Sequence, residues 1–584
     1  MKNYKLLLAL LVLTINQLSA QYNTLWIPDT ISGTTFNLIV KDTFAQFKVG
    51  NQTITGAVNS SKFWGPTLIM NKGAAVNMKV TNKLNDSTTI HWHGMHLPPI
   101  MDGGPHQIIP PGTVWQPYWT VKNQAATLWY HPHLHEHTQA HVTKGIGGFI
   151  IVRDAAEAAL PLPRKYGIDD IPLAITSRRF LTGNQMAYNI IDNYGDYAMV
   201  NGTLNPQVNL PKQVVRLRIL NGEIQRGYNL GFSDNRTFYV IGNDDGLLNA
   251  PVATNRLAIQ TGERYEILVD LSANTVGGTL DLVAYNSPTE IQSLTPGQNT
   301  FGWPGLEGRA SNPTGNNGPL NGGLLNAVDF NVLRINVIAA TTNPITTIPT
   351  ALINNTYWTD AQVTNSRTIN VTGGQMGMPF SLNNEFFSLK KTNATVNLNA
   401  IEKWTIVNNN IFGHAFHLHD VPFKIISRTG GNLSAMRPYE QGWKDVAWIP
   451  IGGTVTFIAK FDDFSDATWP YMYHCHALTH EDEGMMGSFV VKSATPTNEV
   501  NTEGVNYSLS PNPATNRLYV KMADATASVY YIRIINSVGR TLYMLPKPEL
   551  EKGIDISRFA SGIYFMQLTD EKTKQVTTQK FIKQ

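Results

Sequence analysis

The chain has 584 residues, of which 42% are apolar and 15% are charged, and its formal net charge is +3. This length predicts several domains, each with a core of its own. The small net charge and the absence of any block of like charges argue against nucleic acid or an anionic membrane surface as a partner, so a small or neutral partner fits better.

Residues 1 to 20 have the pattern of a secretory signal peptide. Lys2 and Lys5 precede the apolar run Leu6 to Leu13, and Leu18-Ser19-Ala20 precedes the expected cleavage point. A short buried helix is the alternative interpretation. No later run is long and apolar enough to predict a membrane span. The chain has a single cysteine, and an unpaired thiol in an exported protein calls for an explanation, which metal ligation supplies.

Short runs of alternating apolar and polar residues follow the signal, separated by Gly, Pro and Asn. Phe36 to Val40 and Ala75 to Val80 are two of these runs. Such runs at turn-like intervals are typical of β-sandwiches or barrels, and helical periodicity is scarce throughout. The sequence therefore predicts an all-β fold.

All 15 histidines fall in two windows, residues 91 to 141 and residues 414 to 480. His-x-His pairs occur in β-prone sequence at His91/His93, His131/His133, His417/His419 and His474/His476. Because side chains alternate along a strand, both imidazoles of a pair lie on one face. One pair would be ordinary, but four pairs in one chain predict a shared metal cavity. The pattern defines no role for His96, His106, His135, His137 and His141, for which we expect hydrogen bonding behind a ligand or solvent exposure.

Residues 166 to 345 are predicted to form a second β-rich domain, and they contain neither His nor Cys. This domain cannot supply imidazole or thiolate ligands, so we expect its role to be structural. The segment Asn286 to Gly323 is rich in Gly, Pro and Asn and is predicted to be a long loop. It is either a lid over a substrate site or a disordered insertion.

The third domain, residues 346 to 494, holds the densest set of metal-ligating side chains. Cys475, His480 and Met485 follow a β-prone run and lie close together in the sequence. Two imidazoles, a thiolate and a weak axial thioether make the trigonal site of blue copper, so the set needs one further imidazole. His414 supplies it.

The two neighbours of this cysteine indicate a second centre. On an extended strand Cys475 faces one side, whereas His474 and His476 both face the other. One short stretch can therefore contact two metal centres at once.

A polar linker, residues 495 to 506, precedes a small β-rich unit, residues 507 to 584. Its apolar runs include Tyr530 to Ile535 and Gly562 to Leu568, and it contains no catalytic or metal-binding pattern. We expect a small C-terminal β-sandwich here.

Four stretches resemble the copper motifs of the multicopper oxidases, the superfamily of laccase, bilirubin oxidase and cuprous oxidase. They are HWHG at 91 to 94, WYHPH at 129 to 133, HAFHLH at 414 to 419 and HCHALTHEDEGMM at 474 to 486. Trp64-Gly65-Pro66-Thr67 ahead of the first motif adds to the likeness. The resemblance implies three cupredoxin-like Greek-key β-barrel domains, at residues 21 to 165, 166 to 345 and 346 to 494, and four copper ions.

The resemblance also implies a distribution of ligands among the coppers. The type 1 copper would be bound by His414, Cys475, His480 and axial Met485, and the type 2 copper by His91 and His417. The type 3 pair would be bound by His93, His131, His133, His419, His474 and His476. An axial Met lowers the potential of a blue copper, so we expect a low-to-moderate potential.

The C-terminal unit resembles the type A sorting domain of the Bacteroidota type IX secretion system. The likeness lies in SPNP at 510 to 513, ISRFASGIYFMQL at 556 to 568 and the final KFIKQ. It implies export to the periplasm, passage through the secretion machinery, and a secreted or cell-surface protein. An ordinary accessory β-domain is the alternative.

Family resemblance implies one-electron oxidation of a donor at the type 1 copper and four-electron reduction of O2 to water at the other three. Asp102 and Glu481 match family positions linked to proton delivery. The alternative for Asp102 is a turn residue before Gly-Gly-Pro, and for Glu481 a partner that orients a ligand His.

The donor is less well defined by the sequence. Asn410-Ile411-Phe412-Gly413 stands where dedicated cuprous oxidases carry an acidic and a thioether residue, and Met376 and Met378 are better explained by packing. This departure favours phenols or similar organic donors. The alternatives are a Cu(I) or Mn(II) oxidase of the same architecture, a non-catalytic electron-transfer or copper-binding protein, and a copper nitrite reductase.

Overall fold

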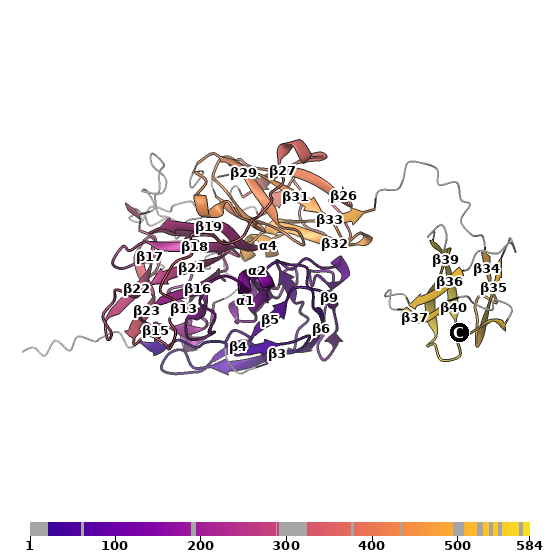
Figure 1. Ribbon diagram of the computed structural model, residues 1–584, viewed down its shortest axis with the longest axis horizontal. Helices are drawn as coiled ribbons and strands as arrows, with labels where there is room; N and C mark the ends of the chain where they lie inside the picture. The colour runs from indigo at the N-terminus through magenta and orange to yellow at the C-terminus, as the bar shows by residue number, and fades with distance from the viewer. Residues whose placement is uncertain are drawn as a thin grey trace, which may run out of the picture. The chain divides into compact units, whose positions relative to one another are not determined.

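The structure is a computed structural model, and by its internal contacts it divides into two compact units, Met1–Ser493 and Ala494–Gln584 (Figure 1). The residues that it describes are 22–59, 63–187, 194–287, 289–290, 324–374, 379–410, 412–431, 435–493, 507–522, 530–536, 541–546, 552–570 and 576–584. The predicted signal, most of the loop Asn286 to Gly323, Met376, Met378 and the linker lie outside the described residues.

The first unit contains three pairs of sheets, and the first pair surrounds a core of alternate strand residues such as Phe36, Leu38 and Val80. One sheet has the order β2 (Thr30–Ser32), β5 (Thr67–Asn71), β11 (Gly148–Arg153), β10 (Ala126–His131) and β7 (His91–His93). The other has the order β4 (Thr53–Val58), β3 (Thr35–Ala45), β6 (Ala75–Lys83) and β8 (Val114–Trp115), with β9 (Tyr118–Thr120) also on β6.

The second pair of sheets has its own core, which includes Leu217, Ile267 and Leu333. The six-stranded sheet runs β1 (Asn23–Thr24), β15 (Pro206–Pro211), β23 (Asp329–Ile338), β22 (Thr279–Tyr285), β17 (Tyr228–Phe232) and β20 (Leu257–Ile259). The seven-stranded sheet runs β14 (Thr203–Leu204), β13 (Tyr197–Val200), β12 (Asp170–Arg178), β16 (Val214–Asn221), β21 (Arg264–Asp270), β18 (Phe238–Asn243) and β19 (Gly246–Thr254). The N-terminal strand β1 therefore pairs within the middle sheet rather than with the first domain.

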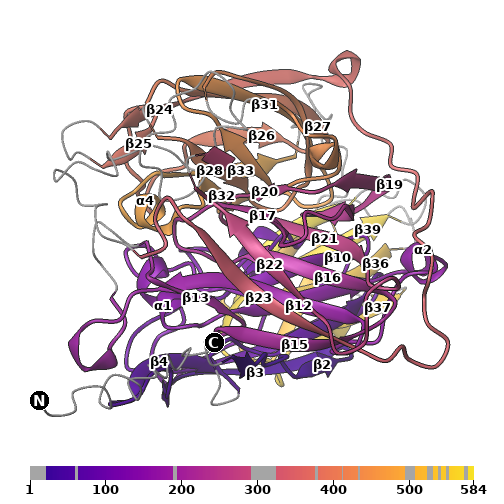
Figure 2. The same ribbon diagram turned by 90° about the vertical axis from the view of Figure 1, so that its left-hand side faces the viewer.

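The third pair of sheets packs around Trp404, Phe457 and Phe489. One sheet runs β25 (Phe380–Leu382), β24 (Asn365–Gly373), β27 (Ala400–Asn408), β31 (Gly453–Phe461) and β29 (Phe423–Thr429). The other runs β26 (Ala394–Asn397), β33 (Met486–Lys492), β32 (Asp466–Cys475), β28 (His414–Leu418) and β30 (Val446–Ile449). Figures 1 and 2 show these orange strands above the indigo strands of the first pair, with the magenta middle strands beside both.

In the described part of the chain the helices are short and lie in the connections between strands. They are α1 (Thr138–Thr143), α2 (Ala155–Ala158) and α4 (Leu478–Asp482), with 3-10 turns η1 (Pro99–Met101), η2 (Thr182–Asn184), η3 (Asp360–Gln362) and η4 (Pro438–Glu440). Within the described residues, no helix has the length and apolar character needed to cross a membrane. Helices α1 and α4 contact each other, which joins the first and third sheet pairs.

The second unit has two small sheets around Leu518, Ile532 and Met566. One runs β34 (Tyr507–Ser510), β35 (Arg517–Met522) and β38 (Ile554–Asp555), and the other runs β37 (Thr541–Pro546), β36 (Tyr530–Asn536), β39 (Gly562–Asp570) and β40 (Val576–Lys583). The predicted all-β class, with three cupredoxin-like barrels and a small C-terminal β-sandwich, is confirmed. The boundaries between the three barrels stay predictions.

Candidate metal centres

The first centre is built around Cys475, the last residue of β32. Its Sγ lies 3.5 Å from Nδ1 of His414, at the start of β28, and 3.6 Å from Nδ1 of His480 in α4. All three side chains are buried. Met485 is also buried, and its carbonyl oxygen accepts a hydrogen bond from the Cys475 N–H. The fold thus brings two imidazoles and a thiol to one point, as the blue-copper pattern requires.

The surroundings of this centre leave its ligands uncharged when no metal is bound. Burial raises the pKa of the Cys475 thiol to about 12 and lowers the pKa of His480 to about 4. Burial and the neighbouring His480 lower the pKa of His414 well below its usual range. A bound cation would displace the thiol proton and stabilise the thiolate, because metal ligation and deprotonation are linked.

A second group of histidines lies between the first and third sheet pairs. Nε2 of His133 is 3.2 Å from Nε2 of His419 and 3.1 Å from Nε2 of His474, and the last two are 3.3 Å apart. Each ring turns its other nitrogen to a carboxylate. Nδ1 of His419 is 2.8 Å from Asp102 Oδ2, and both other Nδ1 atoms lie near Glu481, at 3.1 and 3.2 Å. Three nitrogens therefore converge while a carboxylate lies beside the other nitrogen of each ring, and Nδ1 of His474 also hydrogen-bonds the carbonyl oxygen of Cys475 at 3.0 Å.

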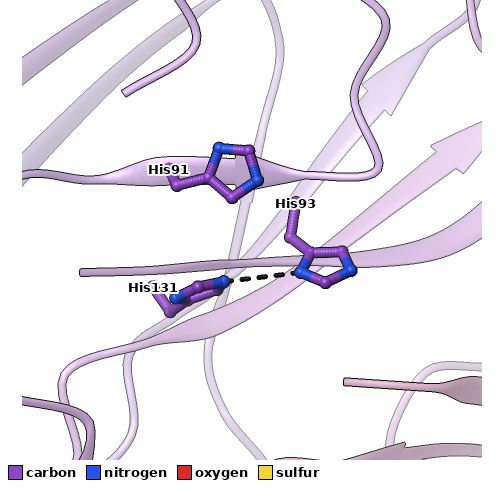
Figure 3. A group of neighbouring side chains, drawn as sticks. All are labelled: His91, His93 and His131. Carbon is purple, nitrogen blue, oxygen red and sulfur yellow. Dashed lines mark hydrogen bonds between the residues drawn. The ribbon is translucent and has the colours of Figure 1, made fainter. Parts of the chain in front are cut away.

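A third group faces it across the same cavity. Nδ1 of His93 lies 3.4 Å from Nε2 of His131 and 3.2 Å from Nε2 of His476, and Figure 3 marks the first of these contacts. Nδ1 of His131 is 2.7 Å from the carbonyl oxygen of Pro132, and Nε2 of His93 is 3.3 Å from Asp445 Oδ1. The rings of His93 and His131 are thus fixed from behind, whereas the buried Nδ1 of His476 has no hydrogen-bond partner among the described residues.

His91 and His417 have the clearest sign of a missing ligand. Nδ1 of His91 lies 2.9 Å from the carbonyl oxygen of Asp102, and Nδ1 of His417 lies 2.8 Å from that of Asp445. A carbonyl only accepts, so each Nδ1 carries the proton and each Nε2 presents a lone pair. Both Nε2 atoms are buried, and neither has a hydrogen-bond partner in the described part of the chain. Orphaned imidazole lone pairs fit a metal ion such as copper.

Burial keeps five of the cavity histidines neutral, which is the form that ligates metals. Burial, reinforced by neighbouring imidazoles, lowers the pKa well below its usual range for His93, His131, His417, His419 and His476. Each of the four His-x-His pairs contributes both of its rings to the cavity. The register explains this, because His91 is opposite His131 and His417 is opposite His474.

Both predicted carboxylates lie at the cavity. Besides its contact with His419, Asp102 has Oδ1 3.4 Å from Nδ1 of His91. Burial alone would raise the pKa of Glu481, but the adjacent His133 and His474 hold it well below its usual range. Each carboxylate therefore contacts two rings, an arrangement that orients ligands and also places an acidic group beside the cavity.

Sequence reasoning missed the residues behind His93 and His476. Arg264 of the middle barrel forms two 2.6 Å hydrogen bonds to the carboxylate of Asp445, which in turn lies against His93. Gly262 has φ +81°, and a Cβ there would lie 2.7 Å from Cγ of His476. The middle barrel, expected to be structural, thus contacts the cavity. Neither residue carries a sequence signal, because arginine and glycine have many ordinary uses.

Three of the unassigned histidines contact residues outside the three groups described above. Nδ1 of His96 is 2.8 Å from Asp420 Oδ1 and its Nε2 is 3.0 Å from Asp463 Oδ2. His106 and His135 both pack against Phe387. The expected hydrogen-bonding role fits His96, which contacts Asp420, the residue after the ligand candidate His419.

Comparison with known families agrees with this geometry. Two models described as "Multicopper oxidase" match residues 40–157 and 358–495. A model described as "Secretion system C-terminal sorting domain" matches residues 508–584.

Individual relatives extend the match across the middle barrel. The multicopper oxidase Mco of Staphylococcus haemolyticus is 30% identical over 435 residues, 73% of this chain and 82% of that protein. The cell division protein FtsP of Xenorhabdus nematophila is 30% identical over 436 residues, 74% of this chain and 84% of that protein. The laccase-like multicopper oxidase CueO of an Ochrobactrum species is a solved structure with 30% identity and a TM-score of 0.68, covering 80% of this chain and 100% of that one. The chain therefore belongs to the multicopper oxidase family and carries a C-terminal secretion sorting domain.

Proposed function

We propose that the protein is a laccase-like oxidase that couples one-electron oxidation of phenolic or similar organic donors to reduction of O2 to water. Four coppers would be held, a type 1 ion by His414, Cys475, His480 and Met485, a type 2 ion by His91 and His417, and a type 3 pair by His93, His131, His133, His419, His474 and His476. The observation that carries the proposal is the convergence of eight buried imidazoles, two of them with orphaned lone pairs, beside a separate His-Cys-His centre.

The chain links the two centres covalently. Bound copper would supply one-electron redox steps, which no protein side chain here can supply by itself. Cys475 is flanked by His474 and His476, and antiparallel pairing sets His474 opposite His417. Electrons accepted near Cys475 therefore have a path of a few bonds along one strand to the histidine cavity.

A pocket of about 10 Å³ beside His480 has room for only a water-sized group, so we propose that an aromatic donor lies at its mouth. Phe412 and Trp448 line it with the imidazole, and Gln225 and Gln260 add amide groups. Aromatic walls suit planar rings, whereas amides can hydrogen-bond a phenolic hydroxyl. The Ochrobactrum relative is described as having oxidase activity towards lignin model compounds and lignosulfonate, which points the same way.

Glu481 and Asp102 are proposed to deliver protons. Both contact rings of the cavity directly, through distances of 2.8 to 3.4 Å. Oxygen reduction consumes protons, and a buried carboxylate next to neutral imidazoles can pass a proton and recover it. Both also orient ligands, so the two roles must be separated by pH profiles.

The decisive experiment measures copper content together with O2 consumption on a panel of phenols, an azo-type dye, Cu(I) and Mn(II). We expect about four coppers per chain and O2 uptake that is fastest with phenols or the dye. Cys475→Ser should lose the blue colour and the donor oxidation while keeping the copper held by histidines. Faster uptake with Cu(I) or Mn(II) would favour a metal oxidase, nitrite turnover without O2 uptake would favour a nitrite reductase, and bound copper with neither activity would favour a carrier.

Export is proposed as the role of the C-terminal unit. A sorting domain implies recognition by secretion machinery, and residues 1 to 20 would first direct the chain to the periplasm. The mature oxidase would then be released or held at the cell surface. Deleting residues 507–584 should leave the oxidase in the periplasm, as cell fractionation would show.

A further inference from the structure

Two histidines outside the copper cavity lie with an aspartate on one edge of the first barrel. His137 immediately precedes α1 and His141 lies one turn later, so both rings project from the same side of the helix. Nδ1 of His137 is 3.1 Å and Nε2 of His141 is 3.7 Å from the same Oδ2 atom of Asp86. All three donor atoms lie within 4.8 Å of one another.

The local contacts prepare His141 as a ligand. Its Nδ1 lies 3.3 Å from Oγ1 of Thr88, which leaves Nε2 directed to Asp86. Burial, with Lys144 adding to it, lowers the pKa of His141 to about 4, so the ring is neutral near pH 7. The Lys144 ammonium is itself 3.4 Å from Asp42 Oδ1, which partly offsets its charge.

The side chains of His137 and Asp86 are open to solvent, so an ion can reach the site. The side chain of His137 is 44% exposed and that of Asp86 is 53% exposed, whereas His141 is 4% exposed. One buried ligand and two partly exposed ones can bind an ion with bonds of about 2.1 Å and leave further positions for water.

We propose that Asp86, His137 and His141 form a fifth metal site, separate from the four copper positions. Two imidazoles and one carboxylate select a divalent transition ion, Zn²⁺ or Cu²⁺, over the oxygen-preferring Mg²⁺ or Ca²⁺. The site does not depend on the oxidase reaction proposed above.

The position of this site connects it to the copper cavity. Asp86 lies in the loop that leads into His91, and His137 closely follows His133. Thr89 lies in the same loop, between Asp86 and His91. Its Oγ1 accepts a 2.7 Å hydrogen bond from the backbone N–H of His133. An ion at this site ties the loop to α1 and so braces two segments that carry cavity histidines.

The test uses the full-length, copper-loaded protein in equilibrium dialysis against Zn²⁺, with bound metal counted by mass spectrometry. We expect one further Zn²⁺ per chain, and at least a tenfold weaker affinity in Asp86→Asn and in His137→Ala. Asp360→Asn is the matched control, since it removes an exposed carboxylate that pairs with Lys403 and has no histidine partner among the described residues. Its affinity should equal that of the unmodified chain.

The same variants are then tested with Cu²⁺ in place of Zn²⁺. Electron paramagnetic resonance should show one additional Cu²⁺ with nitrogen coupling, which Asp86→Asn and His137→Ala remove. Binding of either ion with this dependence supports the site. If no further ion binds, or if all variants bind it equally, Asp86 only pairs with His137 and the proposal is wrong. O2 uptake by both variants reports separately on the oxidase, since neither residue contacts its ligands.

Discussion

Replacement of Gly262 by alanine tests whether the middle barrel, which contains neither His nor Cys, shapes the histidine cavity. The added Cβ would lie 2.7 Å from Cγ, 2.8 Å from Cδ2 and 3.0 Å from Nδ1 of His476. Ordinary contact begins at 3.4 Å, so the ring must move by about 0.7 Å. His476 cannot move freely, because His93, His131 and Trp129 pack around it.

Gly262→Ala has two energetic costs, backbone strain at positive φ and the steric clash with His476. A substitution at a second glycine, which has the strain without the clash, separates them. The positive φ costs an alanine roughly 1–2 kcal/mol, and overpacking adds about 1–3 kcal/mol. Gly277 has φ +87° with no atom within 4 Å of its Cβ position, so Gly277→Ala carries only the backbone cost. A displacement near 1 Å can slow a reaction about 10²-fold. We expect Gly262→Ala to lose at least about tenfold in O2 consumption with the blue absorption kept. If its rate equals that of Gly277→Ala, the middle barrel does not position His476.

Three further predictions concern buried charges. Asp445→Asn removes the closer of two buried carboxylates beside the guanidinium of Arg264 and leaves Asp244 at 3.7 Å. It should lower the free energy of unfolding by about 1.5–3 kcal/mol in denaturant titrations of metal-free protein, and a loss below about 0.5 kcal/mol would refute this. Glu481→Gln should slow O2 reduction by at least about tenfold, keep the blue colour and alter the pH profile, whereas an unaltered profile would leave only an orienting role. Burial alone would lower the pKa of His96, but Asp420 and other carboxylates raise it to about 9 from 6.5. Burial raises the pKa of Asp420 to about 6, so this pair has both charges only above that pH. The stability that it contributes is greatest near pH 6.5 and is lost as pH rises through 9, so denaturation midpoints should fall from pH 6.5 to pH 9 in the unmodified chain but not in His96→Gln.

The directions of the ligand side chains along each strand could be predicted from the sequence, because they follow from strand periodicity. A period of two puts His417 and His419 on one face, and it puts Cys475 opposite His474 and His476, so a local pattern determines side-chain direction. The structure brings these groups together as two separate centres. Their assignment to individual coppers stays a prediction.

Contacts between barrels could not be predicted, because no local pattern encodes them. Arg264 and Asp445 are separated by 181 residues, and each looks like an ordinary charged residue at the edge of a strand. His137 and His141 likewise gain a carboxylate only when the fold brings Asp86 to α1. Sequence spacing indicates which residues share a face, but not which faces meet.

The Arg264–Asp445 pair shows what the middle barrel contributes. A buried ion pair is weak evidence for stability, since desolvation offsets most of the attraction and apolar residues of similar volume often do as well. Its geometry is more informative, because two 2.6 Å hydrogen bonds fix the Asp445 carboxylate, one oxygen of which lies 3.3 Å from His93. The carbonyl oxygen of the same residue fixes His417. One aspartate, held by a barrel that contains neither His nor Cys, therefore orients rings from the first and third barrels, and an apolar interface could not do this.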